Sequence, residues 1–166
     1  MRNSILFLFF FLGSIFTLKA QDEKKPATGG SAQSVYGEIG GSGLFFSGNY
    51  DFMFKGQKGL GARVGFGFFG ISGASAFTFP VGLNYLIGNT SPNYFQIAFS
   101  ATYVTGSIEI GSGTAKGGGM IYVPSIGYRY APKDKGVTGQ IYVGPLIIGG
   151  LAIFPFGGIG FGYKFK

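Results

Sequence analysis

Large apolar residues alternate with glycine, serine or polar residues in one segment after another, up to the end of the chain. In 154–165, for example, Ile159, Phe161 and Tyr163 fall on one face of an extended chain, and glycines fall on the other. A period of two is that of a β-strand, whose successive side chains point to opposite faces. The pattern therefore predicts an all-β protein whose strands meet different surroundings on their two faces.

Seven segments carry the alternation clearly, and each is close to the roughly 9–11 residues of a tilted membrane-spanning strand. They are 44–54, 60–69, 76–87, 93–105, 119–130, 137–145 and 154–165. An eighth strand is predicted at 34–40, turning at 40–43, and the alternative is one long strand over 35–54. The split is favoured because bacterial barrels usually have an even number of strands, with both termini on the periplasmic side.

The even count sorts the connections between strands into two groups. The short polar segments 55–59, 88–92 and 131–136 are predicted to be periplasmic turns. The segments 70–75, 106–118 and 146–153 are predicted to be extracellular. The longest of these, 106–118, is rich in glycine and holds Glu109 and Lys116, and we expect it to make the contacts of the protein with a partner.

The composition suits a surface that faces lipid. The chain has 33 Gly, 20 Phe and 10 Tyr but only 11% charged residues, against about 25% in an average protein. After the first twenty residues, the longest apolar run is 146–156, which Gly149, Gly150 and Pro155 interrupt. Only helices and closed barrels satisfy the backbone hydrogen bonds of a chain in lipid. The predicted fold over 34–166 is therefore an antiparallel up-and-down transmembrane β-barrel of eight strands in the outer membrane.

The N-terminus resembles a cleavable export signal. Arg2 precedes an apolar run over 5–16, and Ala20 is a small residue at a cleavage point before Gln21. The run has about 12 residues, whereas a spanning helix needs roughly 20, so an N-terminal anchor is the less favoured alternative. We expect a signal peptide over 1–20 and a flexible polar leader over 21–33. The absence of cysteine excludes both a lipoprotein anchor and disulfides.

An eight-stranded barrel has an interior just wide enough to be filled by side chains. On the parity of their strands, a few charged residues of both signs are predicted to point inward. They are Glu38, Asp51, Arg63, Arg129 and Lys164. Because buried charges need partners, we predict an ion-paired interior without an open aqueous pore.

Nothing in the sequence indicates catalysis. The chain has no His and no Cys, so it lacks the usual general base and the thiol nucleophile. A paired-carboxylate site from Glu38 and Asp51 is conceivable, but ion pairs of these residues with Arg63 or Arg129 are the favoured interpretation. The glycines of 65–70 match a dinucleotide fingerprint in letters only, since no helix follows. We predict no enzyme activity, no cofactor and no metal site.

The basic residues gather at the ends of segments and form no continuous stripe. They include Lys55, Lys58, Lys133, Lys135, Lys164 and Lys166. This distribution argues against a nucleic-acid surface, and it favours attraction to anionic lipid headgroups. We expect the protein to be a monomer with outer-membrane lipid around it.

Segments 35–50, 59–69, 79–88 and 128–134, with the aromatic C-terminus, resemble small outer-membrane β-barrel proteins common in Bacteroidetes-type bacteria. The function of most members of that family is unknown, so the resemblance implies fold and location. Gly160, Tyr163 and Phe165 also resemble the C-terminal signal that the barrel-assembly machinery reads, which implies that machinery as a partner. Two departures are Lys166 after the last aromatic residue and Gly158 at the usual polar position.

Three functions remain open at this point. The first is a structural or cell-surface interaction role for a barrel plugged by side chains. The second is a narrow conduit or binding protein for small apolar molecules or lipids, which predicts a lateral gap or a cavity lined by residues such as Phe45, Phe69 and Tyr94. The third is a secreted soluble lipid-binding barrel, which predicts apolar residues inside and polar residues outside.

Overall fold

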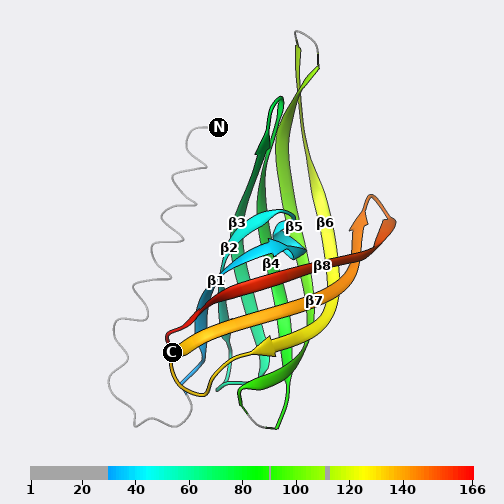
Figure 1. The fold of residues 1–166 in the computed structure, drawn as a ribbon. Coiled ribbons are helices and arrows are strands. Elements are labelled where there is room, and N and C mark those ends of the chain that lie inside the picture. The colour runs from blue at the N-terminus through cyan, green and yellow to red at the C-terminus, as the bar shows by residue number, and fades with distance from the viewer. Residues whose placement is uncertain (1–29, 90, 111–112) are drawn as a thin grey trace, which may run out of the picture.

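The chain forms one closed antiparallel barrel of eight strands, in which each strand pairs with the next and β1 pairs with β8 (Figure 1). The computed structural model describes residues 30–89, 91–110 and 113–166, so the predicted signal peptide and most of the predicted leader lie outside the described residues. The elements are β1 (Gln33–Gly40), the 3-10 helix η1 (Gly41–Gly43), β2 (Phe46–Met53), β3 (Gly59–Ile71), β4 (Ala74–Ile87), β5 (Asn93–Ile110), β6 (Gly113–Tyr130), β7 (Gly136–Ile148) and β8 (Leu151–Lys164). The predicted fold class and the split between β1 and β2 are confirmed.

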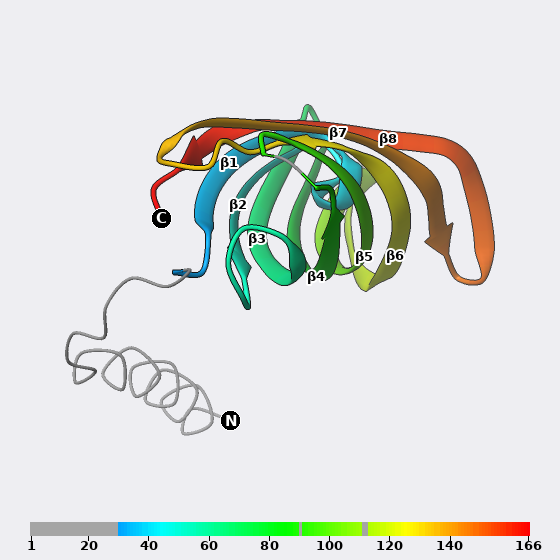
Figure 2. The same cartoon turned by 90° about the horizontal axis from the view of Figure 1, so that it is seen from below.

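The two ends of the described chain meet where the barrel closes. Ser34 lies opposite Lys164 in the β1–β8 register, and the pairing continues to Gly40 opposite Gly158. Beyond the last pair, the backbone N–H of Gln33 donates to the carbonyl of Lys166 at 2.9 Å, and that of Phe165 donates to Gln33 at 3.0 Å. Seen from below, the strands follow one another around the barrel (Figure 2). None of the described residues forms a helix with the length and apolar character of a membrane span.

The two faces of the barrel wall differ as the alternation predicts. Side chains of β1 alternate between buried and exposed positions. The same pattern recurs in the other strands, in the parts that lie towards the short polar connections. The buried positions are mainly polar or charged, whereas the exposed positions carry large aliphatic and aromatic side chains. This arrangement is the reverse of a soluble lipid-binding barrel, which was the third alternative.

The short polar connections all lie at one end of the barrel, which we call the turn end. They run over 54–58, 88–92 and 131–135, close to the predicted positions. At the opposite end, which we call the hairpin end, the connections predicted over 70–75, 106–118 and 146–153 are shorter than predicted. Ser72–Gly73 and Gly149–Gly150 form two-residue turns, and β5 and β6 continue to Ile110 and Gly113. Gly149 and Gly150 both have positive φ, which the type I′ form of the two-residue hairpin turn requires.

The loop predicted over 106–118 is instead a β-hairpin that projects beyond the other strands (Figure 1). Residues 113–120 of β6 pair with β5 alone, and every one of them is exposed. A strand whose two faces meet the same solvent has no reason to alternate apolar and polar residues, so its period-two signal is missing. The apolar pattern therefore ends where the barrel wall ends, although the strands continue.

Candidate functional site in the barrel interior

Arg63 and Glu38 form an ion pair across the interior of the barrel. Arg63 comes from β3 and is 2% exposed, and its Nη1 lies 3.2 Å from Glu38 Oε2 of β1. Its Nε and Nη2 donate to Ser100 Oγ at 3.2 and 2.7 Å, and its Nη1 also donates to the Tyr36 hydroxyl at 3.0 Å. Gln140 Nε2 donates to the same carboxylate at 3.2 Å. The buried charges are thereby paired and hydrogen-bonded, as such groups require.

Asp51 and Arg129 form a second ion pair nearer the turn end. Arg129 Nη1 of β6 lies 3.0 Å from Asp51 Oδ2 of β2. Asn84 Nδ2 donates to the same oxygen at 2.6 Å, and Arg129 Nη2 donates to Ser34 Oγ at 3.4 Å. All four side chains are buried. Asp51 and Glu38 thus each have an arginine partner, so the two carboxylates do not form the paired site that was conceivable from the sequence.

Two tyrosines join these pairs into one network. The hydroxyl of Tyr36 accepts a hydrogen bond from Arg63 Nη1, and the centroid of the Tyr36 ring lies 5.9 Å from the guanidinium carbon of Arg129. The ring of Tyr142 lies 5.5 Å from the guanidinium of Arg63 on another side. Flat cations stack well on aromatic rings. The network is therefore built from residues of β1 to β7 together.

The connection between β1 and β2 folds into the barrel, and we call residues 41–45 the inward turn. Ser42, at its centre, is fully buried. Its N–H donates to the Tyr142 hydroxyl at 3.0 Å, and its Oγ donates to Glu38 Oε1 at 3.3 Å. Its carbonyl accepts from Thr102 Oγ1 at 2.7 Å, and the carbonyl of Gly43 accepts from Thr78 Oγ1 at 3.0 Å.

Glycine at position 41 is required by this close fit. Gly41 has φ of 63°, and an added Cβ would lie 2.0 Å from the hydroxyl of Tyr142. The sequence indicates a turn here, because Gly40, Gly41 and Gly43 surround a serine, but nothing in it says that the turn points inward. Sequence reasoning therefore missed Ser42 with its partners Thr78, Thr102 and Tyr142, in addition to Tyr36, Asn84, Ser100 and Gln140 around the ion pairs.

Lys164 is buried at the turn end and lies apart from the ion-paired network. Its Nζ donates to the carbonyls of Pro132 and Lys133 at 2.5 and 2.7 Å and to Oε1 of Gln57. These partners belong to the β2–β3 and β6–β7 turns. Lys164 thus fastens two turns across the turn end of the barrel, through oxygens that are not carboxylates.

The three residues that resemble an assembly signal point in different directions. Gly160 faces inward, where an added Cβ would lie 3.0 Å from Gln140 and 3.1 Å from the Tyr36 ring. Tyr163 faces outward on β8, and Phe165 follows the strand with its ring 6.3 Å from that of Tyr50. Packing inside the barrel is therefore a second reason for glycine at 160.

The three residues proposed to line a conduit do not lie around one cavity. Phe45 and Phe69 stack with their ring centroids 3.9 Å apart near the hairpin end. Tyr94 is buried with Met53 and Leu86 at the turn end. Among the described residues, no group of three or more His, Cys, Asp or Glu side chains is placed to hold a metal ion.

Comparisons with known proteins bear on the fold. No protein-family model matches the chain, and no curated protein matches it. A similar solved structure is the N-terminal β-barrel domain of OprF from Pseudomonas aeruginosa, with a TM-score of 0.56 and 7% identity over 81% of this chain and 96% of that chain. Another is Neisserial surface protein A, NspA, with a TM-score of 0.50 and 12% identity over 82% of this chain and 95% of that chain. At these identities the likeness supports the closed antiparallel barrel and no finer property.

Proposed function

We propose that this protein is a small outer-membrane β-barrel with a structural or cell-surface interaction role and no catalytic activity. The observation that carries the proposal is the apolar exterior of the barrel wall, whose strands expose residues such as Val81, Phe99 and Ile126. So much exposed apolar surface is unfavourable in water and is expected of a wall that faces lipid. Export by a signal peptide over 1–20 belongs to the same proposal.

Aromatic side chains at the turn end support the membrane location. Several exposed aromatic residues lie in the last positions of their strands or just beyond them. They are Phe54, Tyr85, Tyr128, Tyr130, Tyr163 and Phe165. Barrels carry girdles of aromatic residues at both membrane–water interfaces, where Tyr combines an apolar ring with a hydroxyl. This belt would mark the interface on the side of the turns, which we assign to the periplasm.

We further propose that the interior is closed to ions. The two ion pairs, the tyrosines between them and the inward turn together connect strands on opposite sides of the barrel. An ion would have to separate buried pairs or displace the inward turn, and both changes leave buried charges or polar groups without partners. The interaction role would then fall to the projecting β5–β6 hairpin.

Heat-modifiable gel mobility of protein from outer-membrane fractions tests the location and the closed barrel. We expect unboiled protein from the outer-membrane fraction to migrate differently from boiled protein. A soluble protein without a mobility shift would contradict the proposal. Conductance of the purified protein in planar bilayers tests the interior separately: we expect no channel steps, and regular steps would overturn the closed interior while leaving the location intact.

A second candidate function, binding of a small apolar molecule, is favoured by a hollow of about 530 Å³ at the hairpin end. Among its lining residues are Ser75, Val104, Gly106, Met120, Ile121 and Ile148. It adjoins the buried apolar cluster of Ile121, Val123 and Leu146. If this candidate holds, Val104→Gln should weaken retention of a fluorescent apolar probe by the purified barrel, and unchanged retention would rule the hollow out.

A further inference from the structure

Two glycines face each other on the outer wall of the barrel, where large apolar residues otherwise prevail. Gly37 of β1 lies directly opposite Gly48 of β2, and both are exposed. The neighbouring outward positions are Val35 and Ile39 on β1 and Phe46 and Tyr50 on β2. The pair of glycines therefore leaves a gap in the side-chain layer of the wall.

The chain itself has no need of glycine at either position. Neither residue has a positive φ, and a Cβ added to either would meet no atom within 4 Å. Inward glycines are different, because a Cβ at Gly162 would lie 2.0 Å from the carbonyl of Val35. Glycine weakens a strand and often marks a place where a ligand or another backbone approaches closely. The two outward glycines thus indicate a close neighbour outside the barrel.

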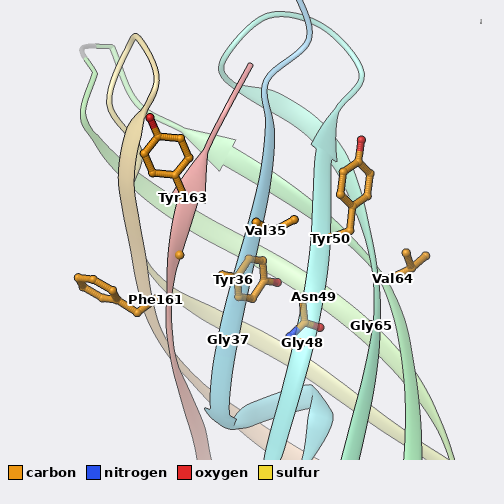
Figure 3. A pocket seen from close by; sticks show the side chains of 11 residues that line it. Val35, Tyr36, Gly37, Gly48, Asn49, Tyr50, Val64, Gly65, Phe161 and Tyr163 are labelled. Atoms are coloured by element: carbon orange, nitrogen blue, oxygen red, sulfur yellow. The ribbon is translucent and has the colours of Figure 1, made fainter.

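The gap is part of a longer hollow with an apolar rim. Phe161 of β8 and Phe66 of β3 border the two glycines in the same cross-strand row, and Phe161 is 71% exposed. Towards the turn end, Figure 3 shows Tyr163 on one side and Tyr50 with Val64 on the other. The hollow also continues towards Ile39 and Phe46. Successive residues of β1, from Val35 to Ile39, line the hollow along its course, so a flexible chain could lie in it parallel to the strand.

Positive charge lies at the turn end of the same strands. Lys55 and Lys58 stand in the β2–β3 turn, Lys166 follows β8, and all three are exposed. Gly37 lies four residues along β1 from Gln33, which is about 13 Å at about 3.3 Å per residue. One leaflet contributes about half of the roughly 30 Å hydrocarbon core. A lipid chain in the hollow would therefore place its headgroup at the level of these lysines.

We propose that the hollow over Gly37 and Gly48 holds one acyl chain of an anionic phospholipid, whose headgroup is bound by Lys55, Lys58 and Lys166. This inference rests on the proposed membrane location. The glycines admit the chain against the backbone between Phe161 and Phe66, and the lysines select the anionic headgroup. The leaflet is the one at the turn end.

Native mass spectrometry of the folded, detergent-purified protein tests this site with phosphatidylglycerol and phosphatidylcholine as probes. We expect one phosphatidylglycerol to bind more tightly than all later ones. The double variant Gly37→Val and Gly48→Val, which fills the gap, should weaken this first binding by about tenfold or more. Ala101→Val, which adds two methyl groups to the outward face of β5 away from the hollow, is the control and should bind as the natural protein does.

The lysines are tested by changing Lys55, Lys58 and Lys166 to Gln, which should abolish the preference for phosphatidylglycerol over phosphatidylcholine. Equal binding by the glycine variant and the control would overturn the proposal. So would a dimer that the glycine variant disrupts, because a second copy would then be the occupant. Each variant is first checked for heat-modifiable mobility. If the natural protein itself lacks this mobility shift, the proposed function fails. If the natural protein folds but binds no first phosphatidylglycerol more tightly than later ones, this inference alone is contradicted.

Discussion

Arg63 is the side chain on which the interior network depends most, because it contacts Glu38, Tyr36 and Ser100 together. The substitution Arg63→Met keeps most of the length of the side chain and removes its charge. Glu38 would remain buried without its cation, so the free energy of unfolding should fall by about 3–5 kcal/mol. Urea unfolding of the protein in lipid vesicles measures the change.

Two comparisons make this prediction specific to the charge. The double variant Glu38→Gln with Arg63→Met should lose less stability than Arg63→Met alone, because no buried charge is left unpaired. Lys135→Met, on an exposed turn, should change the free energy of unfolding by no more than about 0.5 kcal/mol. A loss in the double variant as large as in the single variant would show that the ion pair is not the cause.

Variants of the three residues that resemble an assembly signal should fail at different steps. The residues are Gly160, Tyr163 and Phe165. Tyr163→Ala and Phe165→Ala change outward or terminal side chains, so they should lower barrel assembly in cells but leave refolding of purified protein into vesicles unchanged. Gly160→Val should lower both, because its side chain would collide with Gln140 and Tyr36. Heat-modifiable mobility measures both processes. Normal assembly of the Tyr163 and Phe165 variants in cells would contradict the resemblance to an assembly signal.

The sequence could indicate that Glu38 and Asp51 point inward and pair with arginines, but it could not say which arginine pairs with which carboxylate. Strand parity alone places Glu38, Asp51 and Arg63 on the inner face. In the β2–β3 register, Asp51 lies directly opposite Arg63, and the simplest expectation would pair these neighbours. The salt bridge of Asp51 instead reaches Arg129 of β6. Contacts across a barrel depend on the stagger of all its strands, which no single segment of sequence contains.

At the scale of elements, the inward turn can be probed because the chain has no cysteine. A single cysteine introduced by Ser42→Cys should react with a soluble maleimide at least about tenfold more slowly than one introduced by Ser72→Cys, since position 42 is exposed only when the turn opens. Ser72 lies in the exposed β3–β4 turn. Mass spectrometry follows the labelling, and equal rates would place the 41–45 segment outside the barrel.

The β5–β6 hairpin is an element that contributes little to the barrel beneath it. Beyond Ile108, the β5 strand pairs only with β6. Replacing 109–114 by Asn-Gly would rejoin Ile108 and Ala115, which are already cross-strand partners. We expect the free energy of unfolding to change by no more than about 0.5 kcal/mol, while binding to any cell-surface partner is lost. A barrel that no longer forms would show that the tip is part of the folding unit.

For the whole molecule, charge and apolar surface are divided along the barrel axis. Lysines gather at the turn end, where Lys164 joins two of the turns, and an apolar band surrounds the wall. The sequence predicted this division, because alternation fixes the faces of each strand and the turns hold the charges. It did not predict that two strands extend beyond the wall at the hairpin end, since β5 and β6 continue there without apolar alternation.

A depth series of arginine substitutions would locate the lipid around the whole barrel. Val81→Arg lies midway along β4 on the outer wall, and it should lower the free energy of unfolding in vesicles by about 2–4 kcal/mol. Ile87→Arg, at the turn end of the same strand, should cost about 0–1 kcal/mol. Thr114→Arg, on the projecting hairpin, should cost nothing measurable, because it lies in water. Equal costs at all three positions would mean that the apolar band is not embedded in a bilayer, and the proposed membrane location would then fail.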